Sequence, residues 1–323
     1  MASLCMGKTS SKLICSSNSL IRFLSVSSSV FSPIKNVTVI GAGVMGSGIA
    51  QVAAQTGYNV ILVDKTDEIL EKAKKNIQKS LKRVSRRKFP DDSNAESVFI
   101  DDTFKRIAMT SGSIAESVKN SELIIESVNE NAELKRRVFQ EIEASAPSSA
   151  IFTTNTSSLP LADMAAVIRR KERFAGLHFF NPVQVMKLLE LVRAPETSDQ
   201  TFDVCMEFGK KLGKTVVVCK KDTPGFIVNR LLVPYCFEAL RMLERGDASM
   251  PDIDTAMRLG AGYPMGPFEL TDYIGIDNMM YIMDGWHKRF PDNPLFKPSP
   301  LLEQLVKAGN LGRKTGEGFY KYP

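Results

Sequence analysis

The stretch VTVIGAGVMG, residues 37–46, decides the fold of this chain. Its first four residues are strand-like and all β-branched, and an apolar helical pattern follows its last glycine. Its three glycines allow a tight turn, a close approach of the backbone to a pyrophosphate, and close helix–strand packing. The exposed amides and positive dipole at the start of the helix favour an anion. We therefore expect a dinucleotide-binding loop that comprises Gly41, Ala42, Gly43, Val44, Met45 and Gly46.

A second strand-like run, VILV at 60–63, ends at an acidic residue. This residue, Asp64, follows the glycine loop by about 20 positions, as the dinucleotide-binding pattern requires. A carboxylate there accepts hydrogen bonds from the adenosine ribose and repels a 2′-phosphate, which favours NAD over NADP. The neighbouring Lys65 could pair with a 2′-phosphate, so NADP is not excluded as the cofactor. The alternative interpretation of the whole pattern is a glycine turn followed by an incidental aspartate.

Length and composition fit a soluble globular enzyme. A chain of 323 residues has room for one large or two medium domains with ample cores. Its contents of 43% hydrophobic and 24% charged residues are ordinary, and no apolar run is long enough to cross a bilayer. The formal net charge of +6 is unevenly distributed, so it does not by itself indicate nucleic-acid binding.

Residues 1–33 differ in composition from the rest. They contain many serines, the cations Lys8, Lys12 and Arg22, and no acid. This composition is typical of a mitochondrial transit peptide, and a serine-rich tail without a targeting role is the alternative. The cysteines of the remaining chain have no metal-ligand spacing, so we expect reduced thiols and no metal site. These cysteines are Cys205, Cys219 and Cys236.

The remaining chain divides into two parts. Over residues 34–220 strand-like and helical runs alternate, whereas residues 221–323 have helical patterns only. We therefore predict an α/β, Rossmann-type doubly wound domain with a mostly parallel sheet, followed by a second, all-α C-terminal domain. Further strands are expected at 122–126, 150–154, 174–179, 187–192 and 215–218, and C-terminal helices at 226–244, 251–259 and 267–273.

A predicted helix over residues 70–88 has an apolar stripe on one side and a row of lysines and arginines on the other. The basic side is either simply solvated or binds the phosphates of a small molecule. Nucleic acid ranks last, because the region has no base-reading motif and no stacking aromatics. Ser80 and Arg87 are seven residues apart and share one helix face, so one phosphorylated ligand could contact both.

Only two histidines exist, which narrows the search for a general base. His178 follows a strand in GLHFFNP, residues 176–182, and the turn at Pro182 returns the chain toward Glu190. Glu190 stands among leucines, where a carboxylate is costly to bury without a partner. A histidine held by a carboxylate is a general-base pair; the alternative is a core histidine and an edge-strand glutamate. His287 has the pattern of an ordinary surface-helix residue.

Hydroxyl side chains follow another predicted strand, in TNTSS at 154–158. This segment ends at the carboxyl edge of the sheet, where ligands bind in doubly wound folds. Its serines serve either a ligand or the cap of the following helix.

Five motifs of the chain are long and specific. They are the glycine loop, NTSS at 155–158, HFFNP at 178–182, DTPGF at 222–226 and KTGEGFY at 314–320. Together they resemble the L-3-hydroxyacyl-CoA dehydrogenase family, in its short, monofunctional mitochondrial form. The resemblance covers essentially the whole chain after residue 33, and it implies a Rossmann domain, NAD, and a helical domain that forms a homodimer.

The resemblance also implies roles for particular residues. His178 is expected to remove the proton of the substrate 3-hydroxyl group as hydride leaves C3 for the nicotinamide, and Glu190 to orient the imidazole. Ser157 and Asn229 are expected to hydrogen-bond the reacting substrate. Cofactor contacts are implied for Asp64, Glu130, Lys135, Ser157, Asn181 and Lys314, and coenzyme A contacts for Ser80, Arg87 and Ser157. The family typically has a lysine at the position of Arg87.

We therefore expect an NAD-dependent oxidoreductase of fatty-acid β-oxidation that converts (S)-3-hydroxyacyl-CoA to 3-oxoacyl-CoA in the mitochondrial matrix. One alternative is an NADPH-linked 3-hydroxybutyryl-CoA dehydrogenase, against which Asp64 and the transit-peptide composition argue. Another is a crystallin-like relative without turnover, against which the complete set of Ser157, His178, Glu190 and Asn229 argues.

Overall fold

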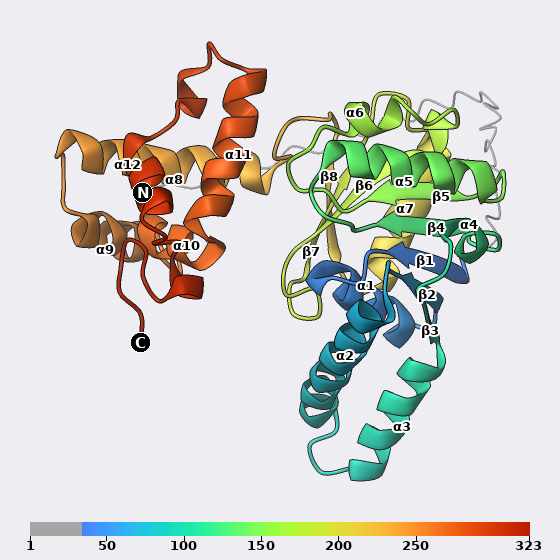
Figure 1. The fold of residues 1–323 in the computed structure, drawn as a ribbon. Coiled ribbons are helices and arrows are strands. Elements are labelled where there is room, and N and C mark those ends of the chain that lie inside the picture. Colours follow the sequence, from blue (N-terminus) through green and yellow to red (C-terminus); the bar gives the residue numbers. More distant parts are fainter. Residues whose placement is uncertain (1–33) are drawn as a thin grey trace, which may run out of the picture. The chain divides into compact units, whose positions relative to one another are not determined.

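The computed structural model describes residues 34–323, and there it confirms the predicted α/β fold (Figure 1). The transit-peptide prediction for residues 1–33 lies outside the described residues. One sheet has the strand order β3-β2-β1-β4-β5-β6-β7-β8, and its neighbouring strands are parallel except β6 and β7. The strands are β1 (Asn36–Ile40), β2 (Asn59–Val63), β3 (Ile107–Thr110), β4 (Leu123–Glu126), β5 (Ile151–Thr154), β6 (Phe174–Phe179), β7 (Leu188–Val192) and β8 (Thr215–Cys219).

Helices cover both faces of this sheet. Because side chains alternate along a strand, Val37 and Val39 of β1 point to one face and Ile40 to the other, and all three are buried. The first face packs against α1 (Val44–Gln55), α2 (Asp67–Lys88) and α7 (Asp199–Lys211). The second packs against α4 (Ile114–Ser117), α5 (Ala132–Ser145) and α6 (Leu161–Ala165). The carboxyl ends of the parallel strands thus meet at one edge, next to the start of α1.

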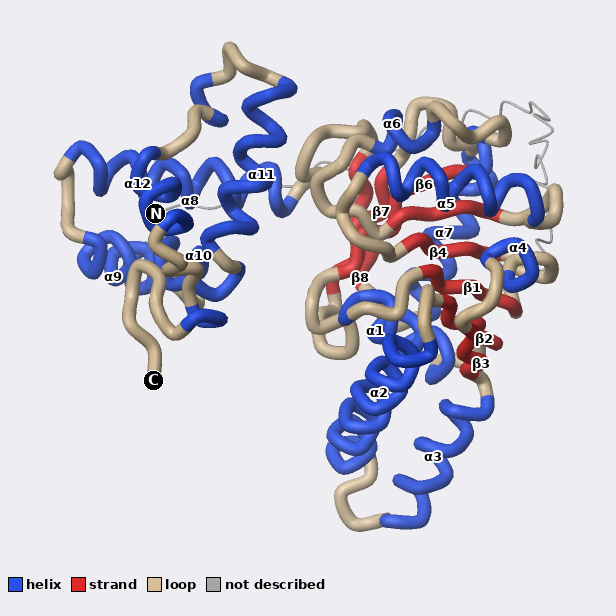
Figure 2. The backbone as a smooth tube through the Cα atoms, in the orientation of Figure 1, coloured by secondary structure: helices blue, strands red, loops and turns tan. Residues whose placement is uncertain are grey.

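The predicted basic helix is α2, and it begins at Asp67 because the Thr66 side chain accepts a hydrogen bond from the Ile69 amide. Its buried side includes Leu70, Ile77 and Leu81, and its other side is exposed and cationic. Figure 2 shows α2 beside α3 (Ser93–Lys105), and the ring of Phe89, directly after α2, packs against Phe99 of α3.

The C-terminal part is all helical, as predicted. Helices α8 to α12 share an apolar core that includes Phe237, Phe268, Met283 and Trp286. The C-terminal tail is fixed to it by the buried Asp272, which accepts hydrogen bonds from the Phe319 and Tyr320 amides at 2.8 and 2.9 Å. The helices are α8 (Val228–Arg245), α9 (Met250–Gly260), α10 (Pro267–Ile274), α11 (Ile276–Arg289) and α12 (Pro300–Lys307).

No helix within residues 34–323 combines the length and the apolar character needed to span a membrane. In the same residues, no three histidine, cysteine, aspartate or glutamate side chains gather as a metal site. Their cysteines, Cys205, Cys219 and Cys236, are buried and form no disulfide.

Candidate functional site

The glycine loop joins β1 to α1 and needs its glycines for steric reasons. Gly41 has a φ of +104°, and a Cβ there would collide with the Ser127 carbonyl at the end of β4. A Cβ on Gly46 would collide with the Gly41 carbonyl, so Gly46 allows α1 to pack closely on the loop. A Cβ on Gly43 would meet nothing within 4 Å, and this open side is the predicted approach for a pyrophosphate.

Asp64 is held beside this loop. Its carboxylate accepts hydrogen bonds from the Ala42 amide at 2.6 Å and from the Lys65 amide at 2.7 Å. It also lines a cavity of about 470 Å³ together with Gly41, Gly43 and apolar side chains of Ile40, Val63 and Ile69. An apolar cavity with a carboxylate at its side suits the adenosine half of a dinucleotide.

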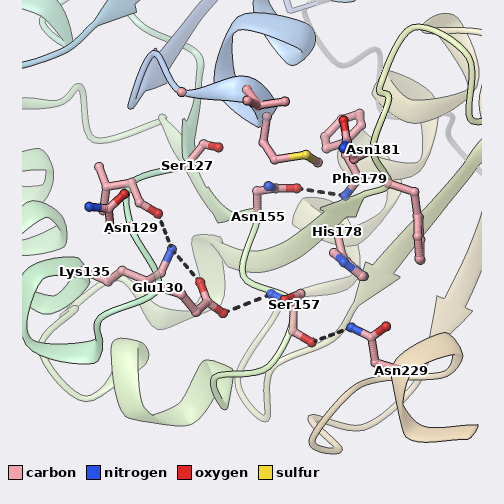
Figure 3. A pocket seen from close by; sticks show the side chains of 15 residues that line it. Ser127, Asn129, Glu130, Lys135, Asn155, Ser157, His178, Phe179, Asn181 and Asn229 are labelled. Atoms are coloured by element: carbon pink, nitrogen blue, oxygen red, sulfur yellow. Dashed lines mark hydrogen bonds and ion pairs between the residues drawn. The ribbon is translucent and has the colours of Figure 1, made fainter. Parts of the chain in front are cut away.

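A second cavity, of about 410 Å³, adjoins the first (Figure 3). The two cavities share Gly43, Ser127, Val128 and Asn129, so together they form one groove along the carboxyl edge of the sheet. The second cavity brings together many of the predicted site residues: Gly43, Val44, Met45, Glu130, Lys135, Ser157, His178, Asn181 and Asn229. Glu190 stands behind it, in contact with His178.

His178 and Glu190 form a buried pair. They are directly opposite each other on the antiparallel strands β6 and β7, and 2.6 Å separates His178 Nδ1 from Glu190 Oε2. His178 is 5% exposed and Glu190 is fully buried. Because β8 pairs with the far side of β7, Glu190 does not lie on an edge strand.

Glu190 also anchors the start of α8. Its Oε1 accepts hydrogen bonds from the Ile227 amide at 3.1 Å and from the Val228 amide at 2.8 Å. A carboxylate is favoured at a helix N-terminus by the free amides and the helix dipole. The two oxygens of one carboxylate therefore serve the imidazole and the first turn of the helix at once.

Ser157 and Asn229 lie on another side of the cavity (Figure 3). Asn229 Nδ2 donates a hydrogen bond to the Ser157 carbonyl at 3.3 Å, which links the segment after β5 to the start of α8. Asn155 Oδ1 accepts from the Phe179 amide at 2.9 Å and so joins the ends of β5 and β6. The strand ends that present Ser157 and His178 are therefore held in a fixed relation.

Glu126, Glu130 and Lys135 form a charged cluster under the cavity. Lys135 is 1% exposed, and its Nζ lies 2.6 Å from Glu126 Oε1 and 3.3 Å from Glu130 Oε2. Burial raises the pKa of Glu126, although Lys135, Thr154 and the Val128 amide oppose that rise. Burial also acts to raise the pKa of Glu130, but Lys135 and hydrogen bonds from residues 156–158 outweigh it and hold that pKa below its usual value.

Other predicted site residues lie outside the two cavities. Lys314 forms an ion pair with Asp277 at 2.5 Å, and neither Ser80 nor Arg87 lines either cavity. Ser80 is mostly buried on α2, whereas Arg87 is exposed. His287 is half-buried on α11 rather than at the surface as predicted, because that helix packs against the C-terminal core.

Several residues of the site were not predicted from the sequence. Asn155 was part of a recognised motif but had no assigned role, and Glu126 was seen only as the end of a strand. A usable signal was the buried run LIIE at 123–126, because an acid that ends a fully buried strand needs a partner. The missed residues that line the second cavity are Ser127, Val128, Asn129, Asn155, Phe179 and Phe180.

This fold and this site define a Rossmann-type oxidoreductase, in which a dinucleotide groove runs past a buried imidazole–carboxylate pair. Comparisons with known proteins place the chain more closely. The sequence profile of the 3-hydroxyacyl-CoA dehydrogenase NAD binding domain matches residues 36–223, and that of the 3-hydroxyacyl-CoA dehydrogenase C-terminal domain matches residues 225–322.

Individual relatives agree with these matches. The chain is 55% identical over 289 residues to the protein named hydroxyacyl-coenzyme A dehydrogenase, mitochondrial, of Rattus norvegicus. The aligned region covers 90% of this chain and 91% of the relative. It is 58% identical over 291 residues to a probable 3-hydroxyacyl-CoA dehydrogenase of Caenorhabditis elegans, covering 90% and 94%. The solved structure of (S)-3-hydroxybutyryl-CoA dehydrogenase from Ralstonia eutropha superimposes with a TM-score of 0.83 at 38% identity, covering 90% of this chain and 99% of that one.

The chain therefore belongs to the 3-hydroxyacyl-CoA dehydrogenase family. This confirms the family resemblance, the oxidoreductase class and the NAD cofactor that the motifs predicted.

Proposed function

We propose that this protein oxidises the C3 hydroxyl group of (S)-3-hydroxyacyl-CoA to a ketone, with NAD as hydride acceptor and His178 as general base. The observation that supports this most is the 2.6 Å contact of His178 Nδ1 with Glu190, in a cavity continuous with the glycine loop. With Nδ1 donating to the carboxylate, Nε2 is the ring nitrogen left to accept a proton.

The proposed reaction balances on these residues. Nε2 of His178 takes the hydroxyl proton as the C3–H bond breaks, and a bound NAD would supply the acceptor for the hydride that leaves C3. The C3–O bond becomes a carbonyl, and the positive charge that the nicotinamide loses appears on the imidazole. Glu190 stabilises that imidazolium, while Ser157 and Asn229 hydrogen-bond the reacting oxygen.

The remaining family roles belong to the same proposal. Residues 41–46 would hold the pyrophosphate of the cofactor, Asp64 would bind its ribose, and Asn181 would lie beside the nicotinamide. Glu130 is at the cavity wall, whereas Lys135 acts through its buried contacts rather than through a free ammonium. Lys314 reaches the cofactor only by leaving Asp277.

A spectrophotometric assay tests the proposed function. Purified protein should oxidise NADH with acetoacetyl-CoA and should use NADPH much less well. Faster turnover with NADPH would support the NADPH-linked alternative. No turnover with either cofactor, in protein that binds NADH, would support a non-catalytic relative.

Replacing Asp64 with alanine should lower kcat/KM for NADH by about tenfold, because a charged acceptor of the ribose hydroxyls is lost. The change should affect NADPH less, since the carboxylate also repels the 2′-phosphate, so the preference for NADH should narrow. Steady-state kinetics with both cofactors measure the ratio. An unchanged ratio would assign the preference to another residue.

The double variant Ser80→Ala with Arg87→Ala should raise KM for acetoacetyl-CoA several-fold, about what a surface charge contact contributes. The effect should shrink as salt rises, because exposed charges are screened over about 10 Å at 0.1 M. An acyl-thioester without the nucleotide should be affected much less. Lys75→Ala removes an exposed cation elsewhere on α2 and is the control. An equal loss on both substrates would indicate damage to the fold instead.

We also propose the location and organisation of the protein. Residues 1–33 are the transit peptide, residues 34–220 the cofactor domain, and residues 221–323 the substrate and homodimer domain. The mitochondrial rat relative supports a mitochondrial location for this protein. The proposed reaction implies that the compartment is the matrix. Import of the full chain into isolated mitochondria, and light scattering of residues 34–323, test these points.

A further inference from the structure

Glu126, Glu130 and Lys135 form a buried triad in which two carboxylates share one ammonium group. Lys135 Nζ contacts both Glu126 and Glu130, at 2.6 and 3.3 Å. The ion pairs found within residues 34–323 bring no second cation to either carboxylate. With both carboxylates ionised, the triad therefore has one negative charge in excess.

Hydrogen-bond donors on both carboxylates favour this charge, against the burial that raises the pKa of Glu126. Glu126 Oε1 accepts from the Val128 amide at 2.7 Å as well as from Lys135. Glu130 Oε1 accepts from the Ser157 and Ser158 amides at 3.2 and 3.3 Å. N–H groups can only donate, so this arrangement stabilises ionised carboxylates.

The excess charge borders the reactive end of the groove. Glu130 and Lys135 line the same cavity as His178 and Asn181, and Figure 3 shows Glu130 and Lys135 across that cavity from His178. In the proposed function, the nicotinamide must lie in this cavity to receive hydride beside His178. The nicotinamide is cationic in NAD⁺ and neutral in NADH.

We propose that the buried triad shifts the affinity of the site toward the oxidised cofactor, because its excess negative charge stabilises the cationic nicotinamide and not the neutral one. This inference rests on the proposed function. In this proposal, the positive charge has a negative partner both before and after hydride transfer. The triad balances the positive charge before hydride transfer, and Glu190 balances it on His178 afterwards.

The test measures Kd for NAD⁺ and for NADH in the full-length protein and in Glu130→Gln. Glutamine keeps an oxygen for the Ser157 and Ser158 amides but removes one negative charge. A unit charge about 10 Å away, at an effective dielectric constant of about 20, corresponds to roughly tenfold in affinity. We therefore expect Kd for NAD⁺ to rise about tenfold more than Kd for NADH.

Two further variants make the test specific. Glu126→Gln removes the same charge from the buried end of the triad and should shift the ratio in the same direction. Glu133→Gln removes a charge from the same helix, α5, but its side chain is 73% exposed, so the ratio should stay at the wild-type value. Thermal melts confirm that each variant is folded. If Glu126→Gln does not fold, Glu130→Gln decides the question.

An equal rise in both dissociation constants would overturn the proposal, because it would mean that Glu130 only orders the Ser157 segment. An unchanged ratio in folded Glu130→Gln would overturn it as well. Failure of the proposed function is a separate result, since the wild-type protein would then bind neither cofactor or bind both without turnover.

Discussion

Replacing Glu190 with glutamine should lower kcat by about 10³–10⁴-fold with little loss of NAD binding. The reason lies in the two tasks of this side chain. The Ile227 and Val228 amides need an oxygen, which turns the new NH₂ group toward His178. Nδ1 of the imidazole must then accept a hydrogen bond, so the ring proton moves to Nε2 and the substrate meets a donor instead of a base.

Pre-steady-state and steady-state rates with NADH and acetoacetyl-CoA measure this effect, and a cofactor titration measures binding. A thermal melt near that of the wild type would show that the glutamine still holds the start of α8. A folded variant with near-normal kcat would mean that His178 and Glu190 are a structural histidine and a buried glutamate, without a catalytic role.

Replacing His178 with alanine should lower kcat by about 10²–10⁴-fold, the usual contribution of a positioned general base. NAD binding should persist, because the glycine loop and Asp64 do not depend on the imidazole. His287→Ala is the matched control, since His287 is the second of the two histidines and lines neither cavity of the groove. Equal rates in the two variants would remove His178 from the mechanism.

Local patterns predicted the parts of this protein that depend on neighbours in sequence. The glycine loop, the alternation of strands and helices, and the return of the chain at Pro182 were all readable, because each depends on a few adjacent residues. The turn also placed Glu190 near His178. That Glu190 lies on an interior strand was not readable, because the pairing of β7 with β8 depends on the whole sheet order.

Long-range contacts explain most of what the sequence did not reveal. Glu190 meets the Val228 amide across 38 positions, and nothing near either residue indicates it. The family resemblance implied a cofactor contact for Lys135, but nothing in the sequence indicated that this lysine is almost fully buried. Its burial depends on Glu126, which belongs to a different element, so no helical pattern in α5 predicts it.

The anchoring of α8 by Glu190 has a consequence for how such an enzyme can arise or be divided. The cofactor groove is built almost wholly from residues that precede α8, so a fragment ending before Ile227 would keep most of the surface that binds a dinucleotide. In that fragment, however, Glu190 would lose the two amides that fix it, and the orientation of the imidazole would be lost with them. The groove for the dinucleotide is in this sense a property of one half of the chain, whereas the fixed His178–Glu190 pair needs residues from both halves.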